Sequence, residues 1–376
     1  QQAAFDGIMQ SVEQGGGTCL LYGVTGSGKT EVYLQAVARV MQEGGKAIVL
    51  VPEISLTPQA MERFRSRFGA RVAVLHSRLS PGERYDEWRR IRLGKVDVVI
   101  GARSAVFAPL TGLKLIVVDE EHEPSYHSEL APRYSAVEVA AKRAKLNQAV
   151  LVLGSATPSV ASYRRGLKGI YRLLTLPERI NGQPMPQVEI VDLRNEFRAG
   201  NNSIFSASLH AALGQCLSAG EQAILFMNRR GYSTFVSCRG CGYVVKCPDC
   251  DVSMTYHKLE GVMKCHYCGR TARIPKVCPE CGKPYLKGFG VGTQQEEQLA
   301  AQFPGVSAVR MDLDTTRTKN AHEALLGRFT RGEAQVLIGT QMIAKGLDIP
   351  NVTLVGVIAA DAMLYIPDYR SGERTF

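Results

Sequence analysis

The stretch LYGVTGSGKTEVYL, residues 21–34, decides the fold class of this chain. It starts inside an apolar run, breaks into glycine and continues with the spacing of a helix. Gly23, Gly28, Lys29 and Thr30 satisfy the pattern G-x-x-x-x-G-K-[ST] in the strand, loop and helix context that the pattern requires. The sequence therefore predicts a phosphate-binding loop between a strand and a helix.

Each residue of this loop has an expected task. The backbone N–H groups from Gly26 through Ser27 and Gly28 to Thr30 are expected to surround the β-phosphate of a nucleotide. Lys29 is expected to contact the β- and γ-phosphates, and the hydroxyl of Thr30 to ligate Mg²⁺. These residues predict a site for a magnesium nucleotide, with Lys29 as a catalytic group.

A second motif, DEEH at 119–122, follows the apolar run 115–118. In enzymes with a phosphate loop, one carboxylate at this place holds the Mg²⁺ shell and the next can polarise the attacking water. We assign Asp119 to the metal and Glu120 to the water. Together with Lys29, these two carboxylates are the predicted catalytic residues.

The rest of the chain indicates an α/β protein with two lobes. Short apolar runs alternate with helical patterns over residues 18–154, and the rhythm returns after residue 222, which predicts doubly wound parallel sheets. A cysteine-rich segment interrupts the second set, so we expect a zinc module inserted there. The predicted bounds are 1–176 for the first lobe, 177–206 for a linker, 207–376 for the second lobe and 236–288 for the zinc module.

Composition favours a polyanionic partner. The chain has 376 residues, enough for two lobes with their own cores, and a formal net charge of +10. An ordinary basic enzyme is the alternative. No apolar run is long enough for a transmembrane helix and the N-terminus lacks the order of a signal peptide, so we expect a cytoplasmic protein without a membrane partner.

Eight of the ten cysteines form four C-x-x-C pairs within one short segment. Such pairs are typical of zinc ligands in a reducing compartment, because each can place two thiolates on one tetrahedral ion. A redox role is the competing interpretation. The eight thiolates predict two zinc ions, but the spacing alone leaves nested, sequential and crossed pairing open. The pairs are Cys238 with Cys241, Cys247 with Cys250, Cys265 with Cys268, and Cys278 with Cys281.

The remaining motifs give the chain a family resemblance. VPEISLTPQ, GARSAVFAP, DEEH, GSATP and GTQMIAKGLD fall in the order of the superfamily 2 helicase motifs, and no guanine-reading NKxD motif is present. LFMNRRGY, the four C-x-x-C pairs and RMDLDTT narrow the match. Along essentially its whole length the chain resembles the PriA family of bacterial replication-restart DNA helicases.

The resemblance implies two RecA-like lobes and an ATP-dependent motor that moves 3′ to 5′ on single-stranded DNA. It also implies stalled or forked DNA as substrate, primosome and single-strand-binding proteins as partners, a monomer, and a place near the nucleoid. The nested zinc pairing has the same support: Cys238, Cys241, Cys278 and Cys281 on one ion, and Cys247, Cys250, Cys265 and Cys268 on the other.

The resemblance also adds site residues. Gln1 corresponds to the family's adenine-contacting glutamine, while Gly346 and Asp348 belong to the predicted ATP site. The segment EPSYHSELAPRY, 123–134, matches an aromatic-rich loop that couples DNA contact to the ATP site. Aromatic faces and charges there suit bases and phosphates, although packing against their own lobe is the alternative. The predicted DNA contacts are Arg103, Tyr126, Arg133, Tyr134 and Thr340.

Two departures from the family pattern temper the expected activity. Leu347 stands where the family has a polar residue, and the chain stops at ERTF before the motif expected to supply an arginine finger. We therefore expect little ATP turnover from this piece. The alternative hypothesis is a zinc-built DNA-binding and partner-docking platform.

Overall fold

The chain folds into two compact units, Gln1–Pro186 (unit 1) and Gln187–Phe376 (unit 2). The division falls inside the predicted linker 177–206, and the individual domain bounds stay a prediction. The structure is a computed structural model. It describes residues 1–52, 58–77, 79–182, 184–227, 234–257, 260–288, 299, 301–311, 315, 321–340, 349–366 and 368–375.

Unit 1 is built on a seven-stranded parallel sheet with the order β3-β4-β2-β5-β6-β1-β7. The inner strands are apolar along their whole length because helices cover both faces. The last strand, β7, was not among the predicted ones. The strands are β1 (Gly17–Gly23), β2 (Lys46–Leu50), β3 (Val72–Leu75), β4 (Val98–Gly101), β5 (Leu113–Asp119), β6 (Val150–Ser155) and β7 (Arg172–Leu176).

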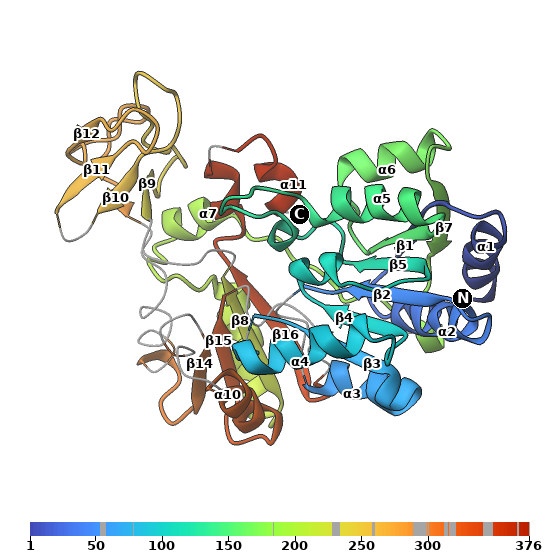
Figure 1. Ribbon diagram of the computed structural model, residues 1–376. Helices are drawn as coiled ribbons and strands as arrows, with labels where there is room; N and C mark the ends of the chain where they lie inside the picture. The colour runs from blue at the N-terminus through green and yellow to red at the C-terminus, as the bar shows by residue number, and fades with distance from the viewer. Residues whose placement is uncertain are drawn as a thin grey trace. The chain divides into compact units, whose positions relative to one another are not determined.

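Two hydrophobic cores fill the space between this sheet and its helices. One core joins the sheet to α1, α2 and α3, and the other joins its opposite face to α4, α5 and the short helix η3. Figure 1 shows α5 and α6 on one side of the sheet and α2 on the other. The helices are α1 (Gln2–Glu13), α2 (Lys29–Gln42), α3 (Pro58–Phe68), α4 (Pro81–Arg92), η3 (Arg103–Phe107), α5 (Ala136–Asn147) and α6 (Val160–Leu167).

Unit 2 contains a four-stranded parallel sheet with the order β14-β15-β8-β16. Helix α8 packs on one face and α10 on the other, with Leu213 and Phe329 buried in the two cores. Helix α7 lies inside the predicted linker. The elements are α7 (Leu193–Arg198), α8 (Ala207–Ser218), β8 (Gln222–Met227), β14 (Ala308–Met311), α10 (Ala321–Thr330), β15 (Val336–Gly339), β16 (Val352–Ile358), η7 (Ala360–Tyr365) and α11 (Ser371–Thr375).

The cysteine-rich segment forms its own small sheet between β8 and β14 in the chain. Its five strands are antiparallel in the order β12-β11-β10-β9-β13. A core of Val236, Met254 and Met263 lies under them together with two cysteines. The strands are β9 (Thr234–Cys238), β10 (Thr255–His257), β11 (Val262–Lys264), β12 (Thr271–Ala272) and β13 (Leu286–Gly288).

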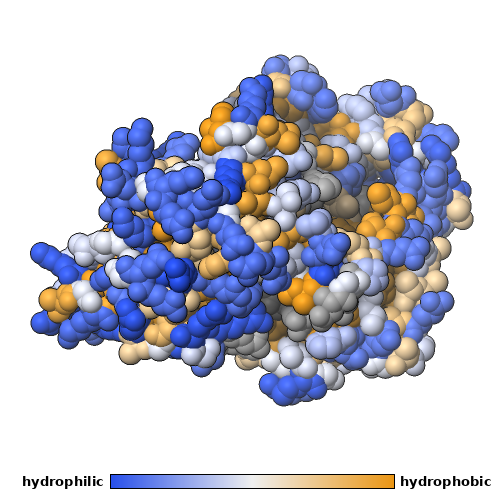
Figure 2. Space-filling model, turned by 90° about the vertical axis from the view of Figure 1, so that its right-hand side faces the viewer, coloured by the Kyte–Doolittle hydropathy of each residue, from blue (hydrophilic) through white to orange (hydrophobic). Residues whose placement is uncertain are grey.

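The predicted fold class is thus confirmed: two α/β lobes with doubly wound sheets and a module inserted in the second. In the described part of the chain, no helix has both the length and the apolar character needed to cross a bilayer. Figure 2 shows one face of the molecule, where hydrophilic side chains cover most of the surface and apolar ones gather in small patches.

Candidate nucleotide site and cysteine clusters

The loop 23–30 has the backbone that a phosphate cradle needs. Gly26 and Gly28 have φ values of 78° and 87°, in the left-handed region that favours glycine. Helix α2 begins at Lys29, so the N–H groups of Lys29 and Thr30 have no acceptor within the helix. The hydroxyl of Ser27 is buried and has no hydrogen-bond partner within the described residues. These donors at a helix N-terminus fit an anionic phosphate group.

Gln1 lies against this loop. Its side-chain amide Nε2 donates a hydrogen bond of 3.0 Å to the carbonyl oxygen of Ser27. A Cβ atom at Gly28 would stand 2.1 Å from the same nitrogen, so glycine is required there both for its φ and for this contact. The predicted adenine contact is thus beside the loop, and its role toward a base stays a prediction.

Lys29 is folded back onto the loop. Its ammonium Nζ donates to the carbonyl oxygen of Gly23 at 2.8 Å and to that of Val24 at 3.4 Å. The side chain is buried, with 9% of its surface exposed. A phosphate in the cradle would offer this cation a charged acceptor in place of two neutral carbonyls.

Asp119 is connected to the phosphate loop through α2. Tyr33 lies on that helix, and its hydroxyl donates to Oδ1 of Asp119 at 3.1 Å. The ring passes so close to β6 that a Cβ atom at Gly154 would stand 1.5 Å from the Tyr33 hydroxyl oxygen. Burial and then the Asp119 charge raise the pKa of Tyr33 well above its usual value, so it remains a donor. This contact fixes the carboxylate relative to the loop.

Glu120 and His122 belong to a polar network next to Asp119. Glu120 adopts a φ of 49°, which is uncommon for a residue with a side chain. The imidazole Nδ1 of His122 lies 2.7 Å from the hydroxyl of Ser155 and 3.6 Å from Oε2 of Glu120. The backbone N–H of Thr157 also donates to that hydroxyl, at 3.0 Å. The DEEH and GSATP motifs are therefore in direct contact.

Glu121 is a site residue that sequence reasoning missed. Its carboxylate is buried and accepts hydrogen bonds from the N–H of Ser159 at 2.7 Å and from the hydroxyls of Ser159 and Ser162 at 3.3 and 3.1 Å. Ser159 is the N-cap of α6. The third residue of DEEH thus fastens the acidic motif to the start of α6.

We expect Glu121→Ala to destabilise unit 1 by about 3 kcal/mol, because three donors, one of them fully buried, lose their acceptor. Trp88 is the single tryptophan and lies in unit 1, so urea unfolding followed by its emission reports on this unit alone. Glu129→Ala, at an exposed carboxylate, is the matched control. Equal midpoints for the two variants would contradict the structural role of Glu121.

The aromatic-rich loop forms a short hairpin. His127 and Ser135 form an antiparallel bridge, and the N–H of Ser128 donates to the carbonyl of Tyr134. Arg103 donates to the carbonyl of His127 at 2.5 Å, and its guanidinium lies 5.6 Å from the ring of Tyr134. Arg133 is exposed at the tip. Arg103 thus joins two of the predicted DNA-contacting segments.

Tyr126 differs from the expectation of a stacking surface. Its side chain is 1% exposed, and its hydroxyl donates to the carbonyl oxygen of Asp119 at 2.7 Å. A base has no access to this ring, because it packs in the core behind the acidic motif. Tyr126 therefore connects the loop to Asp119 in the candidate nucleotide site and offers no face to DNA in this structure.

The predicted residues of unit 2 are only partly visible. Thr340 follows β15 and is 6% exposed, with a hydroxyl that has no partner among the described residues. Gly346 and Asp348 lie outside the described residues, as does Leu347. Their predicted place in the ATP site stays a prediction.

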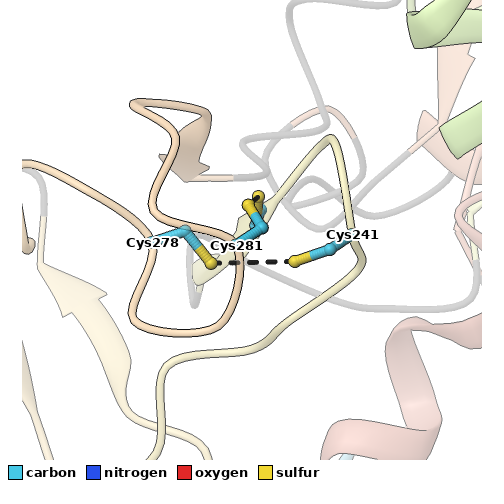
Figure 3. Close-up of side chains that lie close together, drawn as sticks. Cys241, Cys278 and Cys281 are labelled. Atoms are coloured by element: carbon cyan, nitrogen blue, oxygen red, sulfur yellow. Dashed lines mark hydrogen bonds between the residues drawn. The ribbon is translucent and has the colours of Figure 1, made fainter.

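The eight paired cysteines gather into two groups of four. Cys238, Cys241, Cys278 and Cys281 form the outer cluster, and Cys247, Cys250, Cys265 and Cys268 form the inner cluster. Figure 3 shows the sulfur atoms of Cys241 and Cys278 facing each other, with Cys281 next to them. The nested arrangement is therefore the one that the structure adopts.

The sulfur spacing fits a tetrahedral zinc ion. Sγ to Sγ distances are 3.6 Å for Cys238 and Cys281, 3.7 Å for Cys241 and Cys278, and 3.7 Å for Cys247 and Cys268. Four Zn–S bonds of standard length in a tetrahedron place the sulfurs roughly 3.8 Å apart. A disulfide would need about 2 Å, so these distances suit ligands of one ion.

All four C-x-x-C turns share one backbone geometry. The N–H of the first cysteine donates to a carbonyl five residues later, and the residue after the second cysteine donates back to the first. That residue adopts positive φ in each turn, and it is Gly242, Asp251, Gly269 and Gly282 in chain order. Burial raises the pKa of Cys238, but the N–H groups of Cys241 and Gly240 outweigh it and lower the pKa to about 7.

Among the described residues, the module contacts the rest of unit 2 at two places. Beside the outer cluster, Phe197 of α7 packs edge-on against Tyr285 with ring centroids 4.9 Å apart, and Arg198 donates to the carbonyl of Gly240. On another side, the rings of Phe235 and Tyr365 have centroids 4.8 Å apart. Sequence patterns gave no sign of these contacts, since the partners lie far apart in the chain.

Three family models match the chain in succession. They describe a DEAD/DEAH box helicase at residues 1–165, the PriA DNA helicase Cys-rich region (CRR) domain at 247–273 and a helicase conserved C-terminal domain at 291–366.

Among solved structures, Mycobacterium smegmatis helicase Lhr bound to ssDNA and AMP-PNP has a TM-score of 0.53 at 17% identity, covering 99% of this chain and 43% of that one. RecG bound to a three-way DNA junction has a TM-score of 0.50 at 18% identity, covering 94% and 38%. These likenesses support the fold.

Curated relatives are much closer in sequence. The replication restart protein PriA of Bacillus subtilis is 56% identical over all of this chain and 47% of its own length. PriA of Synechocystis is 54% identical over 96% of this chain and 45% of its own length. The chain thus spans about half the length of the curated relatives it matches. Over the part of those proteins that it covers, the chain belongs to the PriA family of replication restart proteins.

Proposed function

We propose that this chain is the motor core of an ATP-dependent DNA helicase that acts in replication restart. The observation that carries the proposal is the nucleotide site of unit 1. A glycine cradle with Lys29 stands at the carboxyl edge of the sheet, and the Tyr33 hydroxyl links its helix to the Asp119 carboxylate. Such a site binds a nucleoside triphosphate with its magnesium ion.

In this proposal each group has one task. Lys29 and the loop N–H groups bind and orient the phosphates, while the oxygens of Thr30 and Asp119 hold the Mg²⁺ that neutralises phosphate charge. Glu120 orients the attacking water and accepts its proton. Gly346 and Asp348, which lie outside the described residues, are proposed as further residues of the ATP site. Movement is 3′ to 5′ on single-stranded DNA, with forked DNA as the substrate.

The two cysteine clusters each hold one Zn²⁺, which fixes the small sheet that they flank. The described protein contacts make this module part of unit 2, and four thiolates would fill the tetrahedral shell of each ion, so zinc serves structure and strand guidance. Primosome and single-strand-binding proteins are the proposed partners of a monomeric, cytoplasmic protein near the nucleoid.

The decisive test is ATP turnover with and without single-stranded DNA. Glu120→Gln should keep ATP binding, because the phosphate cradle and Asp119 remain, and should lower turnover by about 10² or more, the usual contribution of a general base. Removal of streptavidin from one end of a biotinylated oligonucleotide gives the direction. Loss of nucleotide binding in Glu120→Gln would contradict this division of tasks.

The zinc-built platform is the second candidate. It is favoured by the core and the two attachment points of the zinc module. If these 376 residues bind zinc and DNA but their ATP turnover does not respond to DNA, the platform describes this chain better. Slow turnover of the chain by itself stays an expectation for that measurement.

A further inference from the structure

Helix α4 (Pro81–Arg92) contributes little to the hydrophobic core. It begins with a capping box, in which the Ser80 hydroxyl accepts from the N–H of Glu83 and the Glu83 carboxylate accepts from the N–H of Ser80. Ile91 is its one buried residue. The helix, labelled in Figure 1, is therefore held by its cap and by contacts along one side.

That side protects the edge of the sheet. Strand β3 is outermost, and its exposed backbone groups are bonded to side chains of α4. The N–H of Val74 donates to Oε2 of Glu87 at 3.1 Å, and Nη2 of Arg90 donates to the carbonyl of Val72 at 3.4 Å and, just before the strand, to that of Ala70 at 2.7 Å. Glu87 and Arg90 also pair with each other at 2.6 Å. Covering an edge in this way prevents pairing with another strand.

Among the residues that the structure describes, the opposite side of α4 makes no such hydrogen bonds to β3. Successive residues of a helix are 100° apart around its axis, so Trp88, Arg89 and Arg92 all lie within about 60° of Tyr85. This sector of about 120° contains no carboxylate. Tyr85 and Trp88 are 59% and 38% exposed, and the guanidinium of Arg92 lies 5.2 Å from the centroid of the Trp88 ring. Within the described residues, no acidic side chain pairs with Arg89 or Arg92.

The sector begins about one turn from the carboxyl edge of the sheet, which is the edge that carries the proposed nucleotide site. Strand β3 runs parallel to its neighbour β4, so α4 starts at the carboxyl edge and runs back along the sheet. The same edge carries Asp119 and the segment of Arg103 that follows β4. Tyr85 stands about one turn from that edge, and the sector extends roughly 10 Å to Arg92.

We propose that Tyr85, Trp88, Arg89 and Arg92 form a binding face for single-stranded nucleic acid. Two exposed aromatic rings offer surfaces on which unpaired bases stack, and two unpaired arginines supply charge for the phosphates between them. In a duplex the bases are already stacked on one another, so they offer no free face to these rings. The assignment of this face to single-stranded nucleic acid rests on the DNA motor proposed above. Binding to the face can be measured without ATP.

Trp88 makes the test direct, because it is the only tryptophan of the chain. Titration with a short fluorescein-labelled oligo(dT) should quench Trp88 emission along the same curve as the anisotropy of the label. Arg89→Glu with Arg92→Glu should weaken binding at least about tenfold, and the slope of log K against log salt should fall by about 1.4. Tyr85→Ala should weaken it about fivefold or more.

The matched control is Arg164→Glu with Lys168→Glu, which makes the same charge change at two exposed positions in the same unit, one on α6 and one at its C-cap. It should leave the Trp88 quench in place and lower the affinity less. Thermal unfolding checks that every variant is folded. If the label reports DNA binding while Trp88 emission stays constant, the α4 face is not the site and the motor proposal stands. If the label reports no binding, the proposed α4 face and the proposed DNA motor are both wrong. If an acidic peptide quenches Trp88 emission and the oligonucleotide does not, the assignment of the face to nucleic acid is wrong.

Discussion

Lys29→Ala is expected to weaken ATP binding by about a hundredfold and to abolish measurable turnover, while unit 1 stays folded. The ammonium group would make charge-assisted hydrogen bonds to two phosphates, each worth about 1.5–3 kcal/mol. A loss of about 3 kcal/mol corresponds to roughly a hundredfold in affinity. Within the described residues the same group bonds the neutral carbonyls of Gly23 and Val24 and no carboxylate, so its removal costs the fold little.

Titration with a fluorescent ATP analogue measures the affinity, and the urea midpoint of Trp88 emission measures the stability of unit 1. Lys95→Ala, at an exposed lysine of the same unit, is the control and should bind like the parent chain. Affinity in Lys29→Ala within a factor of three of the control would remove the phosphate loop from the proposed site.

Much of this site could be predicted because its chemistry is local in the sequence. The glycines, Lys29 and Thr30 are neighbours, and the left-handed turns found at Gly26 and Gly28 are conformations that glycine favours. The position of Asp119 at the end of a buried strand could also be predicted from the apolar run before it. The strand order could not, since alternation predicts a parallel sheet but does not tell which strands are neighbours.

What the sequence did not predict depends on partners that are distant in the chain. Glu121 was one of three acidic residues in a row until the structure placed it under Ser159 and Ser162. Tyr126 was classified with the exposed aromatics because its loop is rich in them, yet its hydroxyl reaches back to Asp119. Burial of one aromatic in a loop is decided by tertiary packing, which no local pattern encodes.

The cysteines show the same division. The C-x-x-C turns are local, and the glycine after three of the four pairs matches the positive φ found there. The choice among nested, sequential and crossed pairing came from the family resemblance alone. In the structure the pairing of β9 with β13 makes the choice, since it sets Cys238 beside Leu286 and brings the last pair back to the first.

The nested arrangement leads to the second prediction with a large effect. Cys247→Ser with Cys250→Ser should lower the zinc content from two ions to one per chain, because both residues belong to the inner cluster. A structural Zn²⁺ site contributes on the order of 10 kcal/mol of apparent binding energy, which far exceeds what the short strands β10, β11 and β12 supply alone. The inner ribbon should therefore unfold and become accessible to protease.

The outer cluster should survive this change. The inner zinc site acts as a cross-link that shortens the loop between Cys241 and Cys278. When the inner ion is lost, the outer site must close this whole segment as one longer loop. Loop closure depends only on the logarithm of length, so the added cost is roughly 1 kcal/mol, much less than one zinc site provides. Contacts of Phe197 with Tyr285 also hold this end of the module.

Zinc content measured by mass spectrometry, with trypsin cleavage mapped along 247–273, checks both statements. Cys216→Ala is the control, because that thiol is buried in the core of unit 2 and belongs to neither cluster, so two ions should remain. The reciprocal variant Cys278→Ser with Cys281→Ser should lose the outer ion, keep the inner ribbon protected and expose Arg194 and Arg198 of α7 to trypsin, since α7 packs beside that cluster. Loss of both ions in both variants would mean that the clusters fold as one unit, and the nested arrangement would then lack the independence argued here.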